Sequence, residues 1–422
     1  MEAKFAQEKT DQVLIISYNM ILSKTVSDSK VKSNRKHSKS FAIAIVLIIF
    51  MPFYYYFALL THGIEASWPG NIIVSITLLI DIWMLYRICS VKKPLNGALG
   101  LFIAFFVSAI ISYLVTLSGI HRILMFAMLL LGVLLFLRDP LHHNETKFLF
   151  WLFVAAVACI LFRTAIGTED AIASNKVNPN SGGFLLAMVF CLAWSMMFRE
   201  RKVLFVIIGI LCVGLQLVYN SRTALFGLLL FGFIDIVLRI RKKRFSFNSV
   251  FCIMIVLAIM GILIAVVYSQ ILYPLMGYGQ VKIFGKDIFT GRQTIWDFTL
   301  KSIREHFWFG VGSRLNEQQF HEGYYELIMN AHNQPLGTLA ACGIFVFVTF
   351  YFALAHILAQ PYKKNSPNKY NRLPVVFFMV IMMMSYFDIY FMSLYNLLPI
   401  LIAFSILAGT GNNTMIKREI KS

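Results

Sequence analysis

The sequence predicts an all-α polytopic integral membrane protein with about 12 transmembrane helices. Of its 422 residues, 59% are hydrophobic and only 14% are charged, which leaves too little polar surface for a soluble protein of this length. The apolar residues also gather in windows on the order of 20 residues, the length that an α-helix needs to cross a bilayer. Composition and window length together exclude a soluble domain.

A long polar stretch divides the apolar windows into nine before it and three after it. The windows cover about 41–61, 71–89, 96–116, 121–138, 147–164, 182–198, 202–219, 222–240, 249–274, 335–358, 373–391 and 394–410. We therefore expect a basic tail (1–40), spans one to nine (41–274), a long loop (275–334), spans ten to twelve (335–410) and a short tail (411–422).

Lysine and arginine predict which side of the membrane each connection faces. With the N-terminus inside, only ten of the 38 Lys and Arg residues fall in outer connections, and the other 28 fall inside. This asymmetry follows the positive-inside rule and predicts that both termini are cytoplasmic. The net charge of +18 is spread over short inner loops, so we expect anionic lipid headgroups as its partners and no nucleic acid. The polar, lysine-rich start predicts no cleavable signal peptide.

The cysteines argue against a disulfide framework or a zinc site, because no C-x-x-C pair or Cys/His cluster occurs. We expect all six to act as small buried hydrophobic residues. They are Cys89, Cys159, Cys191, Cys212, Cys252 and Cys342.

The loop between the ninth and tenth spans contains a predicted amphipathic helix. In TGRQTIWDFTLKSIREHF, Thr290 and Gln293 form a capping-box pattern, and apolar residues repeat at helical spacing. The repeating residues are Trp296, Leu300, Ile303 and Phe307. Such a helix is expected to lie along the outer surface with its apolar face in lipid or against the spans. A loop of this length is typical of a functional segment, and we predict that 275–334 is the extracytoplasmic catalytic loop.

Two outer arginines stand in places that helix stability does not explain. Arg222 follows Ser221 at the start of a predicted span, and Arg292 comes two residues after Thr290. A cation in the first turn of a helix opposes the helix dipole, whereas an anion bound between the guanidinium and the free N–H groups would account for it. The alternative is that each arginine extends to the lipid headgroups.

His332 lies in IMNAHNQPLG, directly before the tenth span. Asn333 is suited to cap that span and Pro335 to begin it, but neither duty involves the histidine. A neutral imidazole near an arginine-bound phosphate is suited to act as a general base. His306 and His321 are competing candidates in the same loop, and a histidine with no role beyond solvation is the simpler alternative.

Two acidic residues fall in or near predicted spans. They are Asp81 and Asp235. An acid within a membrane segment is either functional or paired with a neighbouring cation, and the sequence leaves both alternatives open.

Four short motifs, in order, resemble the O-antigen ligase/polymerase superfamily. They are SRTALFG, TGRQTIW, GVGS and AHNQPLGTLAACG, with His332–Asn333 followed after nine residues by Gly343. The resemblance implies a glycosyltransferase of the bacterial cytoplasmic (inner) membrane, with its active site on the outer face and a glycan on undecaprenyl diphosphate as donor. It implies that His332 is the base and that Arg222 and Arg292 hold the diphosphate. Arg122, Arg163 and Asn333 are further candidate substrate contacts.

The resemblance leaves the acceptor open. A ligase would pass the chain to lipid A-core, and a polymerase would pass it to another lipid-linked repeat unit. Because a diphosphate is a good leaving group, a base and cations suffice for either transfer, and no DxD-like metal site occurs in the long loop; we expect no metal and no cofactor. The alternatives from other classes are a lipid-linked glycan flippase or transporter, which typically shows paired halves with polar midplane residues, and a scaffold that needs none of the three residues.

Overall fold

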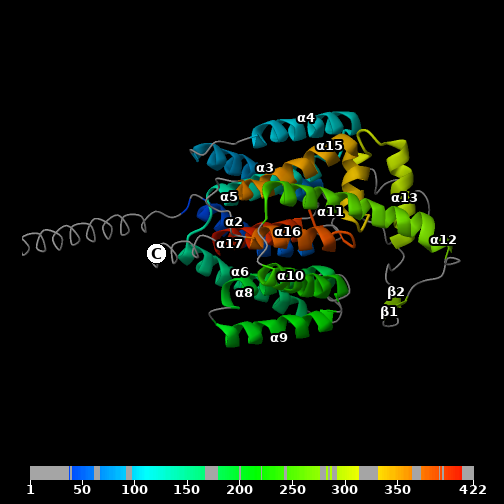
Figure 1. Cartoon of the computed structure of the whole chain (residues 1–422). Helices are drawn as coiled ribbons and strands as arrows, with labels where there is room; N and C mark the ends of the chain where they lie inside the picture. Colours follow the sequence, from blue (N-terminus) through cyan, green and yellow to red (C-terminus); the bar gives the residue numbers. More distant parts are fainter. Residues whose placement is uncertain are drawn as a thin grey trace, which may run out of the picture.

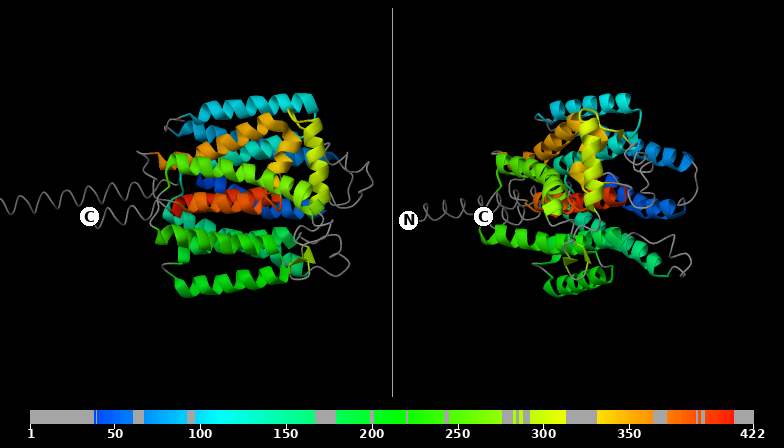
Figure 2. Two further views of the ribbon diagram at one scale, coloured as in Figure 1. Left: turned by 45° about the vertical axis from the view of Figure 1, so that its right-hand side comes forward. Right: turned by 90° about the vertical axis from the view of Figure 1, so that its right-hand side faces the viewer.

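The fold is a bundle of long helices, seen in a computed structural model of the chain (Figure 1). The structure describes residues 38, 40–60, 67–91, 97–166, 179–198, 201–219, 221–241, 245–275, 282–283, 286–287, 292–312, 331–363, 372–388, 390–391 and 394–410. Most helices lie along a common direction, and α13 lies crosswise at one end of them (Figures 1 and 2).

The helices follow the apolar windows closely. Before the long loop they are α2 (Phe41–Leu60), α3 (Ser67–Ser90), α4 (Ala98–Thr116), α5 (Ile120–Arg138), α6 (His143–Ile166), α8 (Pro179–Met197), α9 (Lys202–Tyr219), α10 (Arg222–Ile240) and α11 (Phe247–Val267). After α11 come the π-helix η1 (Tyr268–Leu272) and α12 (Tyr273–Leu275). The later helices are α13 (Arg292–Glu305), α15 (Gln334–Ala359), the 3-10 turn η3 (Gln360–Tyr362), α16 (Leu373–Met384) and α17 (Leu394–Thr410).

Eight helices of the described residues are long and apolar enough to cross a membrane. Four shorter apolar helices match the other predicted windows, and they cover Phe41–Tyr54, Ser181–Met197, Leu373–Met384 and Asn396–Thr410. The helical membrane class is confirmed, whereas the count of twelve crossings and the sidedness of the termini stay predictions.

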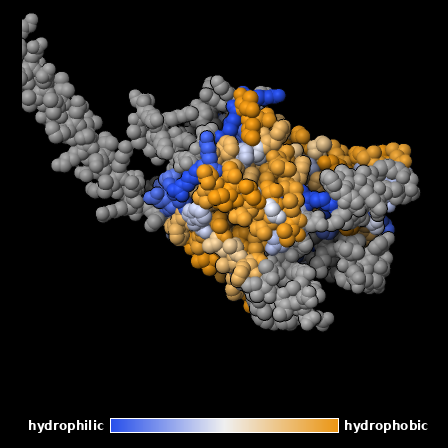
Figure 3. All heavy atoms as spheres, turned by 90° about the horizontal axis from the view of Figure 1, so that it is seen from below, coloured by the Kyte–Doolittle hydropathy of each residue, from blue (hydrophilic) through white to orange (hydrophobic). Residues whose placement is uncertain are grey.

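Large apolar side chains on the outside of the bundle give it a lipid-compatible surface. The face seen in Figure 3 is mostly hydrophobic, and α9 alone exposes Val203, Ile210 and Val218 at 68% or more. Such a surface would be unusual in water and is expected in hydrocarbon. All six cysteines are free, but Cys89, Cys159 and Cys252 are exposed. The expectation that every cysteine is buried is therefore wrong, because these three lie on outward faces of their helices.

Two short strands interrupt the helical pattern between α12 and α13. Strand β1 (Lys282–Ile283) pairs antiparallel with β2 (Lys286–Asp287). Every other element of the described residues is helical.

Helix α13 falls within the stretch predicted to be amphipathic. Its Trp296 and Ile303 are buried, while Phe307 lies beyond the helix end and is 39% exposed. The helix packs against α15, η1 and α11, so its apolar face covers the spans rather than lipid. Thr290, the other half of the predicted capping box, lies outside the described residues.

Two predicted spans have a different shape from the one expected. The window 373–391 is not one helix, because α16 ends at Met384 and residues 385–388 turn. Helix α15 is not continuous either, since Gly343 has φ 77° and ψ 175° within it. The early end of α16 brings Asp388 close to His332, and the break at Gly343 lies against the backbone of residues 308–309.

Candidate active site

His332 has a backbone conformation that is uncommon for any residue other than glycine. Its φ is 45°, one of two positive φ values among the described non-glycine residues. The left-handed region costs an L-residue on the order of 1–3 kcal/mol, and such residues concentrate at functional sites. Surrounding contacts must therefore impose this conformation.

Buried hydrogen bonds fix the chain on both sides of His332. The Trp296 indole N–H donates to the Ala331 carbonyl at 2.9 Å. Asn333 is fully buried; its Oδ1 accepts from the Leu336 N–H at 3.0 Å, and its Nδ2 donates to the Gly261 carbonyl at 2.8 Å. The predicted cap of α15 is thus present.

Gln334, the residue after Asn333, is also fixed by two hydrogen bonds. Its N–H donates to the Ser385 carbonyl at 2.7 Å, and its Oε1 accepts from the Phe391 N–H at 2.9 Å. The segment after α16 therefore lies against the start of α15. Each such bond contributes about 0.5–1.5 kcal/mol, enough in sum to hold the strained histidine.

Four side chains are grouped around this point, and we name them the His332 cluster: His332, Asp388, Tyr390 and Arg292. His332 Nδ1 lies 3.8 Å from Asp388 Oδ1, with the two side chains 27% and 16% exposed. The buried phenol of Tyr390 lies within electrostatic reach of both Asp388 and Arg292. The imidazole thus has a carboxylate on one side and is partly open to solvent, and the same carboxylate and Arg292 both act on the Tyr390 phenol.

Asp388 is the member that the sequence analysis missed. It lies in SYFDIYF, four residues after α16 ends at Met384. The available signal was an acidic residue close to the end of the apolar window 373–391. The prediction of one unbroken span over this window hid that signal. The turn is what brings the carboxylate to His332.

Arg292 and Arg222 lie in the first turns of their helices, as predicted. Arg292 is the first residue of α13 and is half-buried, and Arg222 is the first residue of α10 and is exposed. Ser221 occupies the cap position of α10 but makes no side-chain capping bond, so the first-turn N–H groups of α10 have no side-chain acceptor from it.

A chain of contacts connects the start of α10 to the His332 cluster. The ring of Phe184 stacks on Tyr390 with centroids 4.4 Å apart. Gly183, next to Phe184, packs so tightly on Ser221 that a Cβ there would collide with the serine side chain. The structure therefore brings α8, α10 and the segment after α16 together at one end of the bundle.

The break in α15 receives the turn that follows α13. The Val311 N–H donates to the Ala340 carbonyl at 3.0 Å, and the Ile344 N–H donates to the Phe307 carbonyl at 3.0 Å. A Cβ on Gly343 would lie 2.5 Å from Phe309 N, so only glycine allows this approach. Residues 306–312, which we call the docking turn, thereby satisfy backbone groups that the break frees.

Arg122 in α5 forms a hydrogen bond to the docking turn. The Arg122 side chain is 8% exposed, and its Nη1 donates to the Gly312 carbonyl at 2.8 Å. Ser112 in α4 likewise donates to the Phe309 carbonyl at 2.8 Å. The structure thus gives Arg122 a positioning contact at the break in α15.

The remaining candidates are described only in part. Arg163 lies in the last turn of α6, but its side chain is outside the described residues, as is the whole of His321. His306 is exposed in the docking turn. Asp81 is 6% exposed, and its carboxylate has no hydrogen-bond partner in the part of the chain that the structure describes. Among those residues no group of three His, Cys, Asp or Glu side chains is placed to hold a metal.

Comparison with known proteins finds a family that resembles part of this chain. Residues 210–351 match the family described as O-antigen ligase, and this range contains α10, α11, α13 and the first part of α15, with Arg222, Arg292 and His332. No match was found among curated proteins. The similarity to the O-antigen ligase family thus covers about a third of the chain and supports the resemblance to the O-antigen ligase/polymerase superfamily.

Proposed function

We propose that the protein is a glycosyltransferase that moves a glycan from undecaprenyl diphosphate to an acceptor hydroxyl. The proposed setting is the outer face of the bacterial cytoplasmic membrane, with both termini cytoplasmic. The proposed reaction is of the O-antigen ligase type, with lipid A-core as acceptor; the second candidate is a polymerase that joins lipid-linked repeat units. The observation that carries the proposal is the strained, partly exposed His332 held 3.8 Å from Asp388, with Arg292 at the start of the neighbouring helix α13.

His332 is the proposed general base. Its Nδ1 faces Asp388 at 3.8 Å, which leaves Nε2 to accept the proton of the acceptor hydroxyl. The hydroxyl oxygen then bonds to the anomeric carbon of the donor sugar while the bond from that carbon to the diphosphate oxygen breaks. Asp388 stabilises the imidazolium that results, in the manner of an acid that orients a catalytic histidine.

Arg292 and Arg222 are the proposed anion ligands. The departing diphosphate carries away the bonding electron pair, and preorganised donors stabilise that charge better than water does. Arginine also binds phosphate through two parallel N–H groups. The exposed Arg222 at the start of α10 and the half-buried Arg292 at the start of α13 are both suited to this role. Arg163 is a further proposed contact.

Asn333 and Arg122 are better suited to positioning than to substrate contact. Both amide atoms of Asn333 are used in buried hydrogen bonds, and Arg122 is bound to the docking turn. We propose that Asn333 positions His332 and that Arg122 positions α13 through the docking turn.

The test compares His332→Ala and Arg292→Ala with His306→Ala, an exposed histidine of the docking turn, as matched control. Loss of a general base typically reduces rate by about 10²–10⁴-fold, so surface polysaccharide should disappear in the first two strains while the protein accumulates normally. The control strain should keep it. Normal polysaccharide from His332→Ala cells would refute the catalytic role.

A deletion strain separates the two acceptors. Full-length chains left on the lipid carrier indicate a lost ligase, and single repeats on the core indicate a lost polymerase. If purified protein in liposomes moves the lipid-linked donor across the bilayer without joining glycans, the flippase alternative is correct and the proposal fails.

A further inference from the structure

A second cluster of charged side chains lies at the opposite end of the bundle from His332. Helix α10 begins at Arg222 near the His332 cluster, and Asp235 and Arg239 lie in its last two turns. Helix α16 begins just after Arg372 and ends near Asp388. Asp235, Arg239 and Arg372 are therefore separated from the candidate active site by the length of these helices.

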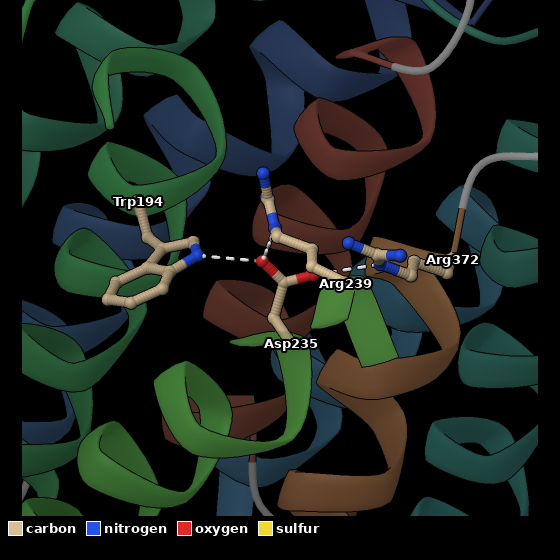
Figure 4. A network of polar contacts seen from close by, with 4 residues as sticks. All are labelled: Trp194, Asp235, Arg239 and Arg372. Carbon is tan, nitrogen blue, oxygen red and sulfur yellow. Dashed lines mark hydrogen bonds and ion pairs between the residues drawn. The ribbon is translucent and has the colours of Figure 1, made fainter. Parts of the chain in front are cut away.

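The Asp235 carboxylate is fully buried and accepts three donors (Figure 4). Arg239 Nε donates to Oδ2 at 2.5 Å, and Arg372 Nε donates to Oδ1 at 2.9 Å. The Trp194 indole N–H donates to Oδ2 at 3.0 Å. This pairing decides between the alternatives that the sequence left open for Asp235.

The three charges do not cancel. Two guanidinium groups share one carboxylate, so the cluster carries a net charge of about +1 at neutral pH. Both arginines bind Asp235 through Nε, and in Figure 4 the terminal nitrogens of Arg239 extend away from the carboxylate. The two arginine side chains remain 22% and 24% exposed. Their terminal N–H groups have no protein acceptor in the described part of the chain.

The surroundings hold this arrangement in place. The rings of Trp194 and Phe198 stack with centroids 4.5 Å apart, and the Arg239 guanidinium lies 5.8 Å from the Phe198 ring centroid. Gly232 allows α10 to approach, because a Cβ there would already lie 3.1 Å from Trp194. Two guanidinium groups are thus held in place where α10 ends and α16 begins.

We propose that Arg239 and Arg372 form a binding site for a phosphate group. Planar guanidinium groups with free terminal N–H donors match phosphate oxygens, and a basic site between the ends of transmembrane helices is suited to an anionic lipid headgroup. Free inorganic phosphate offers the same oxygens. The site does not depend on the proposed function, since none of its residues lies near His332.

The test uses the purified full chain in detergent and native mass spectrometry with added phosphatidylglycerol. Arg239→Lys and Arg372→Lys keep the ion pair to Asp235 but remove the planar fork, so folding should be retained. Arg241→Lys, an exposed arginine just beyond α10, is the matched control. We expect each of the first two variants to bind phosphatidylglycerol about tenfold more weakly, which corresponds to about 1.4 kcal/mol, and the control to bind it as the natural protein does.

Two further measurements complete the test. Binding of phosphatidylethanolamine, whose net charge is zero, should be weaker in the natural protein and little changed by the variants. If 10 mM inorganic phosphate displaces phosphatidylglycerol, the site takes free phosphate as well; if it does not, the ligand is the lipid headgroup. Unchanged phosphatidylglycerol binding in both lysine variants, or an equal loss for both lipids, would overturn the proposal.

Discussion

Gly343→Ala tests whether the break in α15 holds the docking turn against this helix. The glycine has φ 77° and ψ 175°, a region that is essentially restricted to glycine. Its missing Cβ makes room for the backbone of Trp308 and Phe309. An alanine would therefore both strain the backbone and push the docking turn away.

The size of the effect follows from these contacts. Backbone strain in this region costs about 1–3 kcal/mol. Displacing the turn also removes the hydrogen bonds Val311 N–H to Ala340 O and Ile344 N–H to Phe307 O, each worth about 0.5–1.5 kcal/mol. The sum is about 2–6 kcal/mol. Even the lower figure shifts the docking equilibrium by about 30-fold.

Hydrogen exchange measures the effect directly. The Val311 and Ile344 amides should lose protection in Gly343→Ala, and glycan transfer should fall, while the other helices exchange as before. Gly100→Ala is the matched control, because a Cβ there meets nothing within 4 Å. If Gly343→Ala protects both amides normally and transfers glycan at the usual rate, the docking turn does not act as described.

Three other substitutions probe the cluster from different sides. Trp296→Phe removes the hydrogen bond to the carbonyl before His332 and should lower transfer about tenfold with a small loss of thermal stability; an unchanged rate would show that this bond does not position the base. Asp388→Asn should reduce transfer by about 10–100-fold without unfolding the protein, because its side chain reaches solvent and its carboxylate lies 3.8 Å from the imidazole, where an ion pair near a protein surface contributes up to about 4 kcal/mol; full activity would exclude a role beside the histidine. Gly183→Ala forces a Cβ against Ser221 and should weaken donor binding more than it slows the chemical step, as KM and kcat measured separately will show.

The helices were predictable because burial in lipid leaves a strong local signal. Each apolar window became a helix near its expected position, and Asn333 capped α15 as its position before Pro335 indicated. The first-turn positions of Arg222 and Arg292 followed from the same local rules.

Contacts between distant segments were not predictable in the same way. Asp388 approaches His332 only because α16 ends at Met384, and hydropathy alone does not show where a helix stops inside an apolar window. The break at Gly343 depends on the docking turn, which precedes α15 in the chain. Arg122 likewise gained its partner, Gly312, from a segment that no sequence pattern links to α5.

The position of the docking turn has a consequence for biogenesis. The turn is synthesised before α15 and is close to it in sequence, so the hydrogen bonds across the helix break can form as soon as α15 enters the membrane. The contacts of Gln334 with Ser385 and of His332 with Asp388 must wait until α16 has emerged from the ribosome and inserted. We expect the docking turn and α15 to be assembled first and His332 to be aligned only after α16 has inserted.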